Sequence, residues 1–146
     1  MNKKKLDTNM GTKVITWSDN GKGHITPSAI TAFTRGFCHD FAYAMNEMTD
    51  WPIIGIGGEE DCPGHYVCYS PHIDDFVDIQ GPGALERWPV LVKRLIREWK
   101  PDEYPVMYRP LDRTIGKPFA QTILDTVMSM PAKRTHKGLE KFKQIA

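Results

Sequence analysis

The sequence has no long apolar run, no internal repeat and few cysteines, and each absence narrows what the chain can be. Its stretches without charge are short and broken by proline and glycine, whereas a membrane-spanning helix needs roughly 20 apolar residues. The basic residues at the start are not followed by the apolar core of a secretory signal. With 146 residues, 40% of them hydrophobic, the chain can build one core. We therefore expect one globular domain in the cytoplasm, without a membrane partner.

Basic residues are missing from the middle of the chain. From Gly36 to Glu86 there is no Lys or Arg but ten Asp or Glu, whereas the rest of the chain carries 19 basic and 8 acidic residues. This distribution predicts an acidic surface near the middle segment and a basic one elsewhere, although a solvated acidic face without a ligand explains it equally well. The basic residues within 132–146 fit a solvated helix end better than a nucleic-acid contact, so we do not expect a nucleic-acid partner.

Hydrophobic spacing and turn residues predict an α+β fold, in which an early helical region is followed by strands and then by further helices. Thr26 followed by Pro27 predicts the start of a short helix that runs through Phe33. The chain divides into a flexible N-terminal tail over 1–11, a single globular domain over 12–131 and a basic C-terminal segment over 132–146. The other predicted elements are a strand over 13–17, a helix over 37–48, strands over 51–58, 65–70 and 75–79, a helix within 84–99 with an apolar stripe of Leu91, Leu95, Ile96 and Trp99, a proline-rich connector over 101–110, and a helix over 119–130.

One cysteine lies in a setting that activates thiols. Gly36-Phe37-Cys38-His39-Asp40 places Cys38 just inside the start of an amphipathic helix. Unpaired N–H groups and the positive end of the helix dipole stabilise a thiolate there, and the thiolate is the nucleophilic form. The same N–H groups can face the oxyanion that forms when a carbonyl is attacked. The alternative is that Cys38 is a small buried hydrophobic residue, as free cysteines often are.

A histidine and a carboxylate follow on two predicted strands. Strand alternation puts His65, Val67 and Tyr69 on one face, so that His65 can face a core helix from the strand edge, while Cys68 takes the opposite face. Asp78 comes 13 residues after His65, on the neighbouring strand if the short turn makes a hairpin. A carboxylate there can hold the imidazole in the tautomer that presents a free nitrogen to the thiol.

Asp75 competes with Asp78 for this role. The two are three residues apart on one strand, so they face opposite sides and only one of them can meet the histidine. We favour Asp78, because it stands between Val77 and Ile79, where an unpaired carboxylate is costly. Asp75 fits a turn.

These three segments together resemble a known family. The runs 36–45, 65–67 and 76–81 are similar to the core of the papain-like cysteine hydrolases, above all to the transglutaminase-like and related bacterial or phage branches. The resemblance implies a papain-like core, in which the cysteine's helix packs on a small antiparallel sheet, here with extra C-terminal helices. It implies Cys38 as nucleophile, His65 as base and Asp78 as the orienting carboxylate. The expected activity is hydrolysis or acyl transfer at an amide or ester bond of a peptide or protein, without a metal or other cofactor, and the acidic surround suits a basic or amine-bearing substrate.

The sequence departs from the family's pattern at two places. The polar side chain that completes the oxyanion hole, often a Gln upstream of the cysteine, has only Asn20, Thr31 and Thr34 as neutral candidates. His39 stands where a papain-type enzyme often has Trp, and it is a bystander if it is exposed. A catalytically silent binding module of phages or mobile elements, which acts by blocking or recruiting a partner, is therefore the alternative function.

A zinc site is a second alternative. Cys62-x-x-His65 has the spacing of a ligand pair, and imidazole and thiolate are the usual zinc ligands. A structural zinc needs a second close pair, however, and Cys38 and His39 are adjacent helical residues whose side chains diverge. If there is no zinc site, Cys62 and Cys68 are packing residues and not ligands. We expect the acidic run 59–61 to be a solvated loop.

Overall fold

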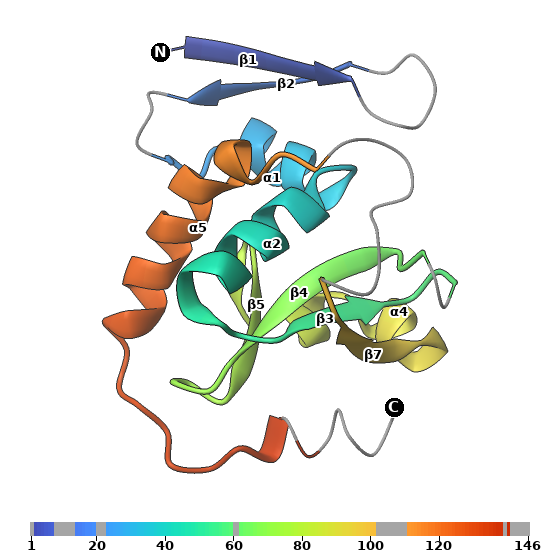
Figure 1. Ribbon diagram of the computed structural model, residues 1–146, viewed down its shortest axis with the longest axis vertical. Helices are drawn as coiled ribbons and strands as arrows, with labels where there is room; N and C mark the ends of the chain where they lie inside the picture. Colours follow the sequence, from blue (N-terminus) through green and yellow to red (C-terminus); the bar gives the residue numbers. More distant parts are fainter. Residues whose placement is uncertain are drawn as a thin grey trace.

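The computed structural model describes residues 2–7, 14–19, 23–59, 62–101, 111–138 and 140. Its fold is α+β, as expected, with a five-stranded sheet that has helices on both faces (Figure 1). Helix α2 (Cys38–Thr49) lies across one face, flanked by α1 (Pro27–Thr34) and α5 (Arg113–Met128), and the short helices α3 (Ala84–Arg87) and α4 (Pro89–Arg94) cover the other. None of the described helices is long and apolar enough to span a membrane.

The sheet is antiparallel throughout and has the order β6-β5-β4-β3-β7. Every residue of strands β3 and β4 is buried, which is what a sheet covered on both faces requires. Cys68 pairs with Ile53 on one side and Val77 on the other, which fixes the register of the three central strands. The strands are β3 (Ile53–Ile56), β4 (His65–Ser70), β5 (Asp75–Asp78), β6 (Gly81–Pro82) and β7 (Ile96–Trp99).

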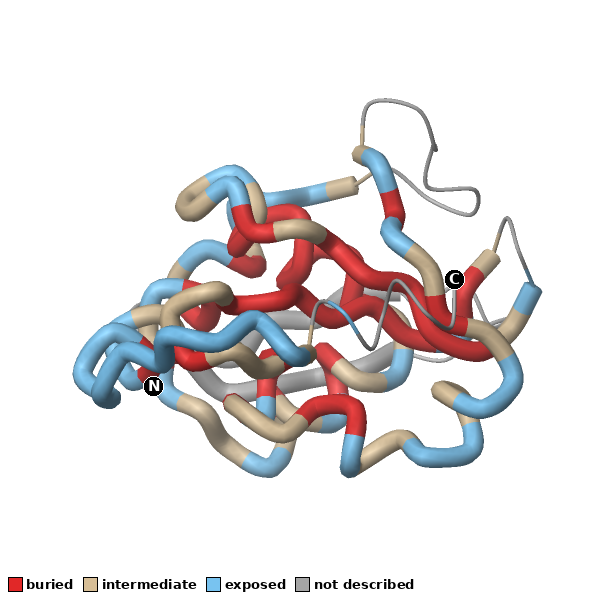
Figure 2. Tube along the Cα trace, turned by 90° about the horizontal axis from the view of Figure 1, so that it is seen from below, coloured by how far each residue is buried: buried red, intermediate tan, exposed pale blue. Residues whose placement is uncertain are grey.

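Two hydrophobic clusters lie on the two faces of the sheet. The larger joins α1, α2 and α5 to the sheet, and the smaller joins α3 and α4 to it. The buried parts of the chain lie in the middle of the molecule, with exposed segments around them (Figure 2). Helix α5 approaches α2 so closely that a Cβ at Gly116 would lie 2.5 Å from the carbonyl oxygen of Asp40. Trp99 also ties β7 to α2, because its Nε1 donates to the Tyr43 hydroxyl at 2.7 Å. The first half of α2 is thus fixed from both sides.

Several predicted elements are confirmed almost to the residue. Thr26 caps α1, its hydroxyl accepting from the Ala29 amide at 3.1 Å, and Pro27 is the first helical residue. The second helix begins at Cys38, and the strand that begins at His65 has the predicted bounds. The other predicted helices and strands shift by a few residues at their ends, with two exceptions given below, and α5 begins at Arg113, six residues before the predicted start at Phe119.

The prediction is wrong over 96–99, which is strand β7 rather than the end of a helix. The apolar stripe suited a helix, but Ile96 and Trp99 pair with Ile56 and Ile53 on β3. Without β7, the backbone groups along that side of β3 would lack partners, so strand pairing outweighs the helical spacing of the apolar residues.

Within the predicted tail over 1–11, β1 (Asn2–Asp7) instead pairs with β2 (Val14–Asp19), because backbone hydrogen bonds can order a polar segment. Residues 102–110 of the predicted connector, and 141–146 of the C-terminal segment, lie outside the described residues.

Candidate active site

Cys38 is the first residue of α2. Phe37 precedes it as the N-cap and provides no side-chain cap, so the amides of the first turn keep the positive end of the helix dipole beside the thiol. The Phe37 amide donates to the carbonyl of Ala32 at 3.2 Å, which holds the end of α1 against the start of α2. Cys38 is 7% exposed, buried but not sealed.

The register of β4 and β5 brings His65 and Asp78 together. Cys68 and Val77 are direct partners, so His65, three residues before the first, and Asp78, one after the second, share the opposite face. His65 Nε2 lies 3.0 Å from Asp78 Oδ2, and each side chain is only 1% exposed. Because the carboxylate accepts from Nε2, it orients the ring, and Nδ1 is the nitrogen left to exchange a proton.

Asp78 is held by three more donors. Arg87 Nη2 donates to Oδ1 at 2.6 Å, the Gln80 amide donates to Oδ1 at 2.8 Å, and Trp88 Nε1 reaches Oδ2 at 3.3 Å. Burial raises the pKa of Asp78, but the hydrogen bond to His65 and the charges of His65 and Arg87 lower it, with a net decrease. Asp78 is therefore a fixed anion.

The sequence reasoning missed Arg87 and Trp88. Arg87 also donates to the carbonyls of Pro82 and Gly81, at 2.6 and 2.7 Å, which binds α3 to the end of the sheet. The ring of Trp88 lies 4.8 Å from that of His65 and covers one side of it. The signal available in the sequence was their position after the turn that follows Asp78.

Cys38 and His65 change each other's protonation. Burial raises the pKa of the Cys38 thiol, but interactions with His39 and His65 outweigh it and lower the pKa to about 6. Burial lowers the pKa of His65, whereas Asp78 and Cys38 raise it, to about 9. Nδ1 of His65 is buried and makes no hydrogen bond of ordinary geometry within the described residues, so its contact with the thiol is looser than an ideal one. These two shifts favour a thiolate beside an imidazolium around neutral pH.

The face of β4 differs in part from the expectation. Tyr66 and Cys68 lie under α2, with Cys68 Sγ 3.4 Å from the carbonyl of Ala42, whereas Val67 belongs to the cluster of α3 and α4. His65 shares the face of Val67 and nevertheless interacts with Cys38, since it is the first residue of the strand. The other residues on this face of β4, Val67 and Tyr69, pack with the cluster of α3 and α4 and not with α2.

Asp75 is excluded as the partner of His65. Its two oxygens accept from the backbone amides of Phe76 and Gly83, at 2.7 and 2.9 Å. The choice of Asp78 over Asp75 agrees with this geometry. Cys68 packs in the core, and burial raises the pKa of its thiol, the opposite of the shift at Cys38.

His39 is not an exposed bystander. Its side chain is 1% exposed, it interacts with the Cys38 thiol, and its ring lies 5.8 Å from that of Tyr66. The sequence did carry a signal, namely a histidine next to the nucleophile with an acidic residue after it.

Of the upstream candidates for the oxyanion hole, the two that the structure describes are engaged within their own helix. The hydroxyl of Thr31 donates to the carbonyl of Pro27 at 3.1 Å, and that of Thr34 to the carbonyl of Ile30 at 2.7 Å, both within α1. Asn20 lies outside the described residues.

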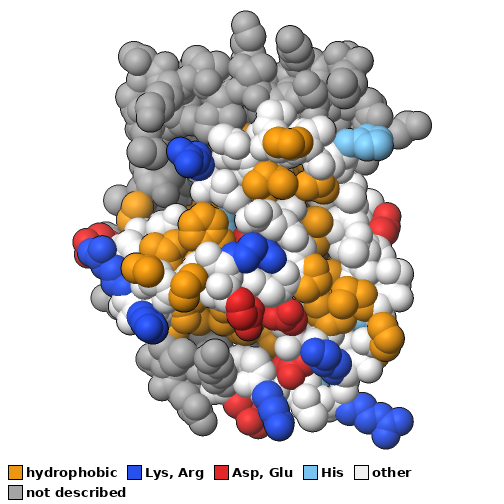
Figure 3. Space-filling model, turned by 180° about the vertical axis from the view of Figure 1, so that it is seen from behind, with side chains coloured by type: hydrophobic (Ala, Val, Ile, Leu, Met, Phe, Trp, Pro, Cys, Tyr) orange, Lys and Arg blue, Asp and Glu red, His pale blue; other side chains and the backbone are white. Residues whose placement is uncertain are grey.

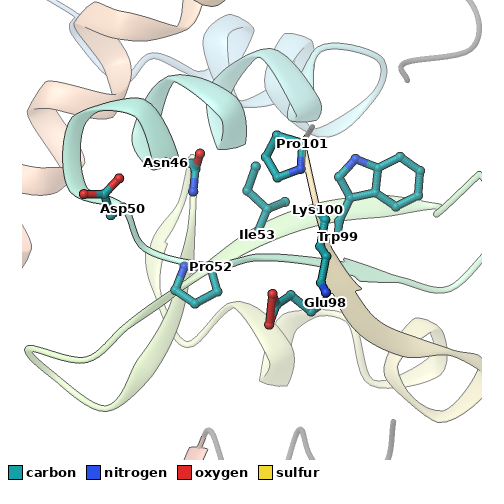
Figure 4. Close-up of a pocket in the computed structure, with 8 residues that line it drawn as sticks. All are labelled: Asn46, Asp50, Pro52, Ile53, Glu98, Trp99, Lys100 and Pro101. Carbon is teal, nitrogen blue, oxygen red and sulfur yellow. The ribbon is translucent and has the colours of Figure 1, made fainter. Parts of the chain in front are cut away.

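No group of three or more His, Cys, Asp or Glu side chains that could hold a metal ion is found in the described part of the chain. A pocket of about 310 Å³ opens between the end of α2, β3 and β7, and none of Cys38, His65 and Asp78 lines it (Figure 4). The residues around this pocket are Asn46, Asp50, Pro52, Ile53, Glu98, Trp99, Lys100 and Pro101.

The charge separation along the sequence is partly undone by folding. Glu47, from the segment without basic residues, lies 3.2 Å from Lys117 and 3.6 Å from Arg113 of α5. Glu59 pairs at 3.8 Å with Arg94 of α4. On the face drawn in Figure 3, basic side chains accordingly lie among acidic ones rather than apart from them.

Searches of known protein families, of curated proteins and of solved structures found no match to this chain.

Proposed function

We propose that this protein is a thiol-dependent hydrolase or acyltransferase that acts on an amide or ester bond through an acyl-enzyme on Cys38. One observation carries the proposal: the buried imidazole of His65 meets the Asp78 carboxylate at 3.0 Å and also interacts with the Cys38 thiol. This arrangement gives a nucleophile, a base and an orienting group in the order that acyl transfer needs. Cys38 at the start of a helix adds backbone donors for an oxyanion.

The proposed reaction begins with attack of the Cys38 thiolate on the carbonyl carbon. The negative charge moves to the carbonyl oxygen, which faces the first amides of α2. As the intermediate collapses, His65 gives its proton from Nδ1 to the leaving amine or alcohol, and a thioester remains on Cys38. His65 then takes a proton from water or an acceptor amine, whose attack breaks the C–S bond and returns the electron pair to sulfur. Asp78 stays ionised in both halves.

The same geometry supports a relationship between this protein and the papain-like cysteine hydrolases. A helix that starts at the cysteine packs on an antiparallel sheet whose neighbouring strands carry the histidine and the aspartate. In this proposal the substrate is a peptide or protein, and the reacting group is a backbone amide or a glutamine side chain. The substrate is basic or bears an amine. No step requires a cofactor.

The test is to trap the acyl-enzyme. The full chain is mixed with p-nitrophenyl acetate, and intact mass together with peptide mapping locates the acetyl group. We expect one acetyl on Cys38, released slowly in buffer and faster with an added primary amine. Cys38→Ala and His65→Ala abolish the labelling, and Cys68→Ala, the matched control, retains it. Acetylation of the three cysteines at equal rates would overturn the proposal.

A catalytically silent binding module is the second candidate, and two observations favour it. Cys38 is only 7% exposed, and the hydroxyls of Thr31 and Thr34 are bonded within their own helix. A thiol that reacts with a small alkylating agent at low pH, but forms no acyl-enzyme with p-nitrophenyl acetate or with peptide thioesters, would favour this candidate over catalysis.

A further inference from the structure

Arg87 binds three oxygen atoms around the end of the sheet. Its Nη2 donates to Oδ1 of Asp78 at 2.6 Å and to the carbonyl of Gly81 at 2.7 Å, and its Nη1 donates to the carbonyl of Pro82 at 2.6 Å. The Arg87 side chain is 28% exposed, whereas that of Asp78 is 1% exposed. Because a guanidinium is planar and always charged, these bonds fix a positive charge against one oxygen of a buried carboxylate.

The two oxygens of Asp78 meet two different cations. Oδ1 accepts from Arg87 and, at 2.8 Å, from the Gln80 amide. Oδ2 accepts from Nε2 of His65 at 3.0 Å and lies 3.3 Å from Nε1 of Trp88. These donors occupy both oxygens, and an ionised carboxylate accepts about four hydrogen bonds. One negative charge is therefore shared between a guanidinium and the imidazolium of His65.

We propose that Arg87 is a positioning residue for the reaction: by sharing the charge of Asp78, it limits how strongly His65 holds its proton and keeps that proton transferable to a leaving group. Arg87 acts through Asp78 and not on the reacting atoms. The inference rests on the proposed function, because it takes His65 as the group that gives its proton to the leaving amine or alcohol.

A carboxylate that met only His65 would hold the imidazolium more tightly. A nearby anion favours the protonated imidazole and a nearby cation disfavours it, so Arg87 on the other oxygen opposes part of the effect of Asp78. The pKa of His65 is already raised to about 9. A proton donor works best when its pKa lies near the working pH. A further rise in the pKa of His65 would make it a poorer acid toward the leaving group.

The groups around His65 that carry or can carry charge come from α2, β5 and α3. The residue of β3 opposite His65 is the apolar Ile56, and the two basic residues of α4, Lys93 and Arg94, are exposed. Arg87 is the cation that is bonded to the carboxylate of this pair. The groups are Cys38 and His39, which interact with each other on α2, Asp78 of β5 and Arg87 of α3.

The first experiment is an NMR titration of the His65 ring in the full chain. The wild-type midpoint should lie near pH 9. In Arg87→Met it should rise by about one pH unit, because the carboxylate then meets a single cation. Arg87→Lys, which keeps a positive charge but not the planar fork, should fall between the two. The matched control is Arg94→Met, which removes an exposed arginine 3.8 Å from Glu59 and should leave the midpoint unchanged.

The second experiment compares two esters, p-nitrophenyl acetate and phenyl acetate, as acetyl donors to Cys38, followed by intact mass over time. In both reactions the C–O bond of the ester breaks and a thioester forms on sulfur. The p-nitrophenolate leaves with little help from a proton, whereas the more basic phenolate takes the proton of His65 and leaves as phenol. Arg87→Met should therefore slow the reaction with phenyl acetate about threefold more than that with p-nitrophenyl acetate. A role in holding α3 alone would slow both reactions equally.

A folded Arg87→Met protein in which His65 titrates at pH 9 or below would overturn the proposal, and so would an equal loss of rate with the two esters. If the Arg87 variants do not fold, the side-chain nitrogen signals of arginine in the wild-type protein decide the matter. The signals of Arg87 should shift as His65 is titrated, because both bind one carboxylate, and those of Arg94 should not. Arg87 signals that stay constant through this titration would overturn the proposal.

The two experiments also separate this inference from the proposed function, because the titrations need no turnover. Titrations as described, in a chain that forms no acyl-enzyme on Cys38 with either ester, would contradict the proposed function and leave the shared charge of Asp78 intact. An acyl-enzyme on Cys38, together with an unchanged His65 midpoint in Arg87→Met, would contradict this inference alone.

Discussion

Asp78→Asn is the substitution that tests the site most directly. It keeps the shape of the side chain and removes the charge that His65 meets at 3.0 Å. Arg87 retains its bonds to the carbonyls of Pro82 and Gly81, so the sheet end keeps its tie to α3. The variant should fold with a modest loss of stability, about 1–3 kcal/mol, from leaving buried donors less well satisfied.

The size of the effect on His65 follows from its pKa. The rise from 6.5 to about 9 in the folded protein corresponds to about 3 kcal/mol in favour of the imidazolium, at about 1.4 kcal/mol for each pKa unit. Asp78 and Cys38 together produce this rise against burial, which lowers the pKa, so the net value does not divide simply between them. We expect the His65 pKa to fall below 8 in Asp78→Asn and the Cys38 pKa to rise, because the thiolate loses much of its cationic neighbour. A rise of the Cys38 pKa from about 6 to about 8 would slow its alkylation at pH 7 by about tenfold.

The assay measures the His65 ring by NMR titration and the Cys38 thiolate by its ultraviolet absorbance, both against pH. Asp75→Asn is the matched control, since Asp75 lies on the same strand but accepts only from backbone amides. It should leave both titrations unchanged. A folded Asp78→Asn protein in which His65 still titrates near 9 would refute the role of the carboxylate.

Three further predictions concern the surroundings of the site. Gly116→Ala should lower the free energy of unfolding in urea by about 1–3 kcal/mol, because its Cβ would lie 2.5 Å from the Asp40 carbonyl oxygen; an unchanged midpoint would contradict this contact. Cys68 should resist iodoacetamide at pH 8 until the chain is denatured, since burial raises its pKa, and labelling in the native state would contradict its packing. Arg87→Met should raise the pKa of Asp78, seen as a carboxyl titration in NMR at higher pH, and Arg94→Met, an exposed control, should not.

The local elements of this fold follow from short-range chemistry. A threonine before a proline starts α1, apolar residues at helical spacing produce α2, and an alternating run with branched and aromatic residues produces β4. Each signal acts within one or two turns of the chain, so the bounds of these elements could be predicted. The places of Cys38, His65 and Asp78 on a helix and two strands could be predicted for the same reason.

Prediction from the sequence was wrong where strand pairing between distant segments competes with the helical spacing of apolar residues. The run Ile96–Trp99 has an apolar pattern that suits a helix, and the backbone of β3 recruits it as a strand. The ion pair of Glu47 with Lys117 likewise joins segments that are 70 residues apart, so a charge count along the chain does not give the charge of a surface.

The sequence by itself determined which residues could form a thiol site, because the residue types, the start of a helix and the alternation of two strands are local properties. Only the tertiary structure decided how that site is held. Arg87 and Trp88 reach Asp78 from the element that follows the sheet, and His39 is enclosed because α5 and β4 pack on either side of α2. Burial and the charges that neighbours supply depend on contacts between distant segments, and these contacts set the thiol's pKa.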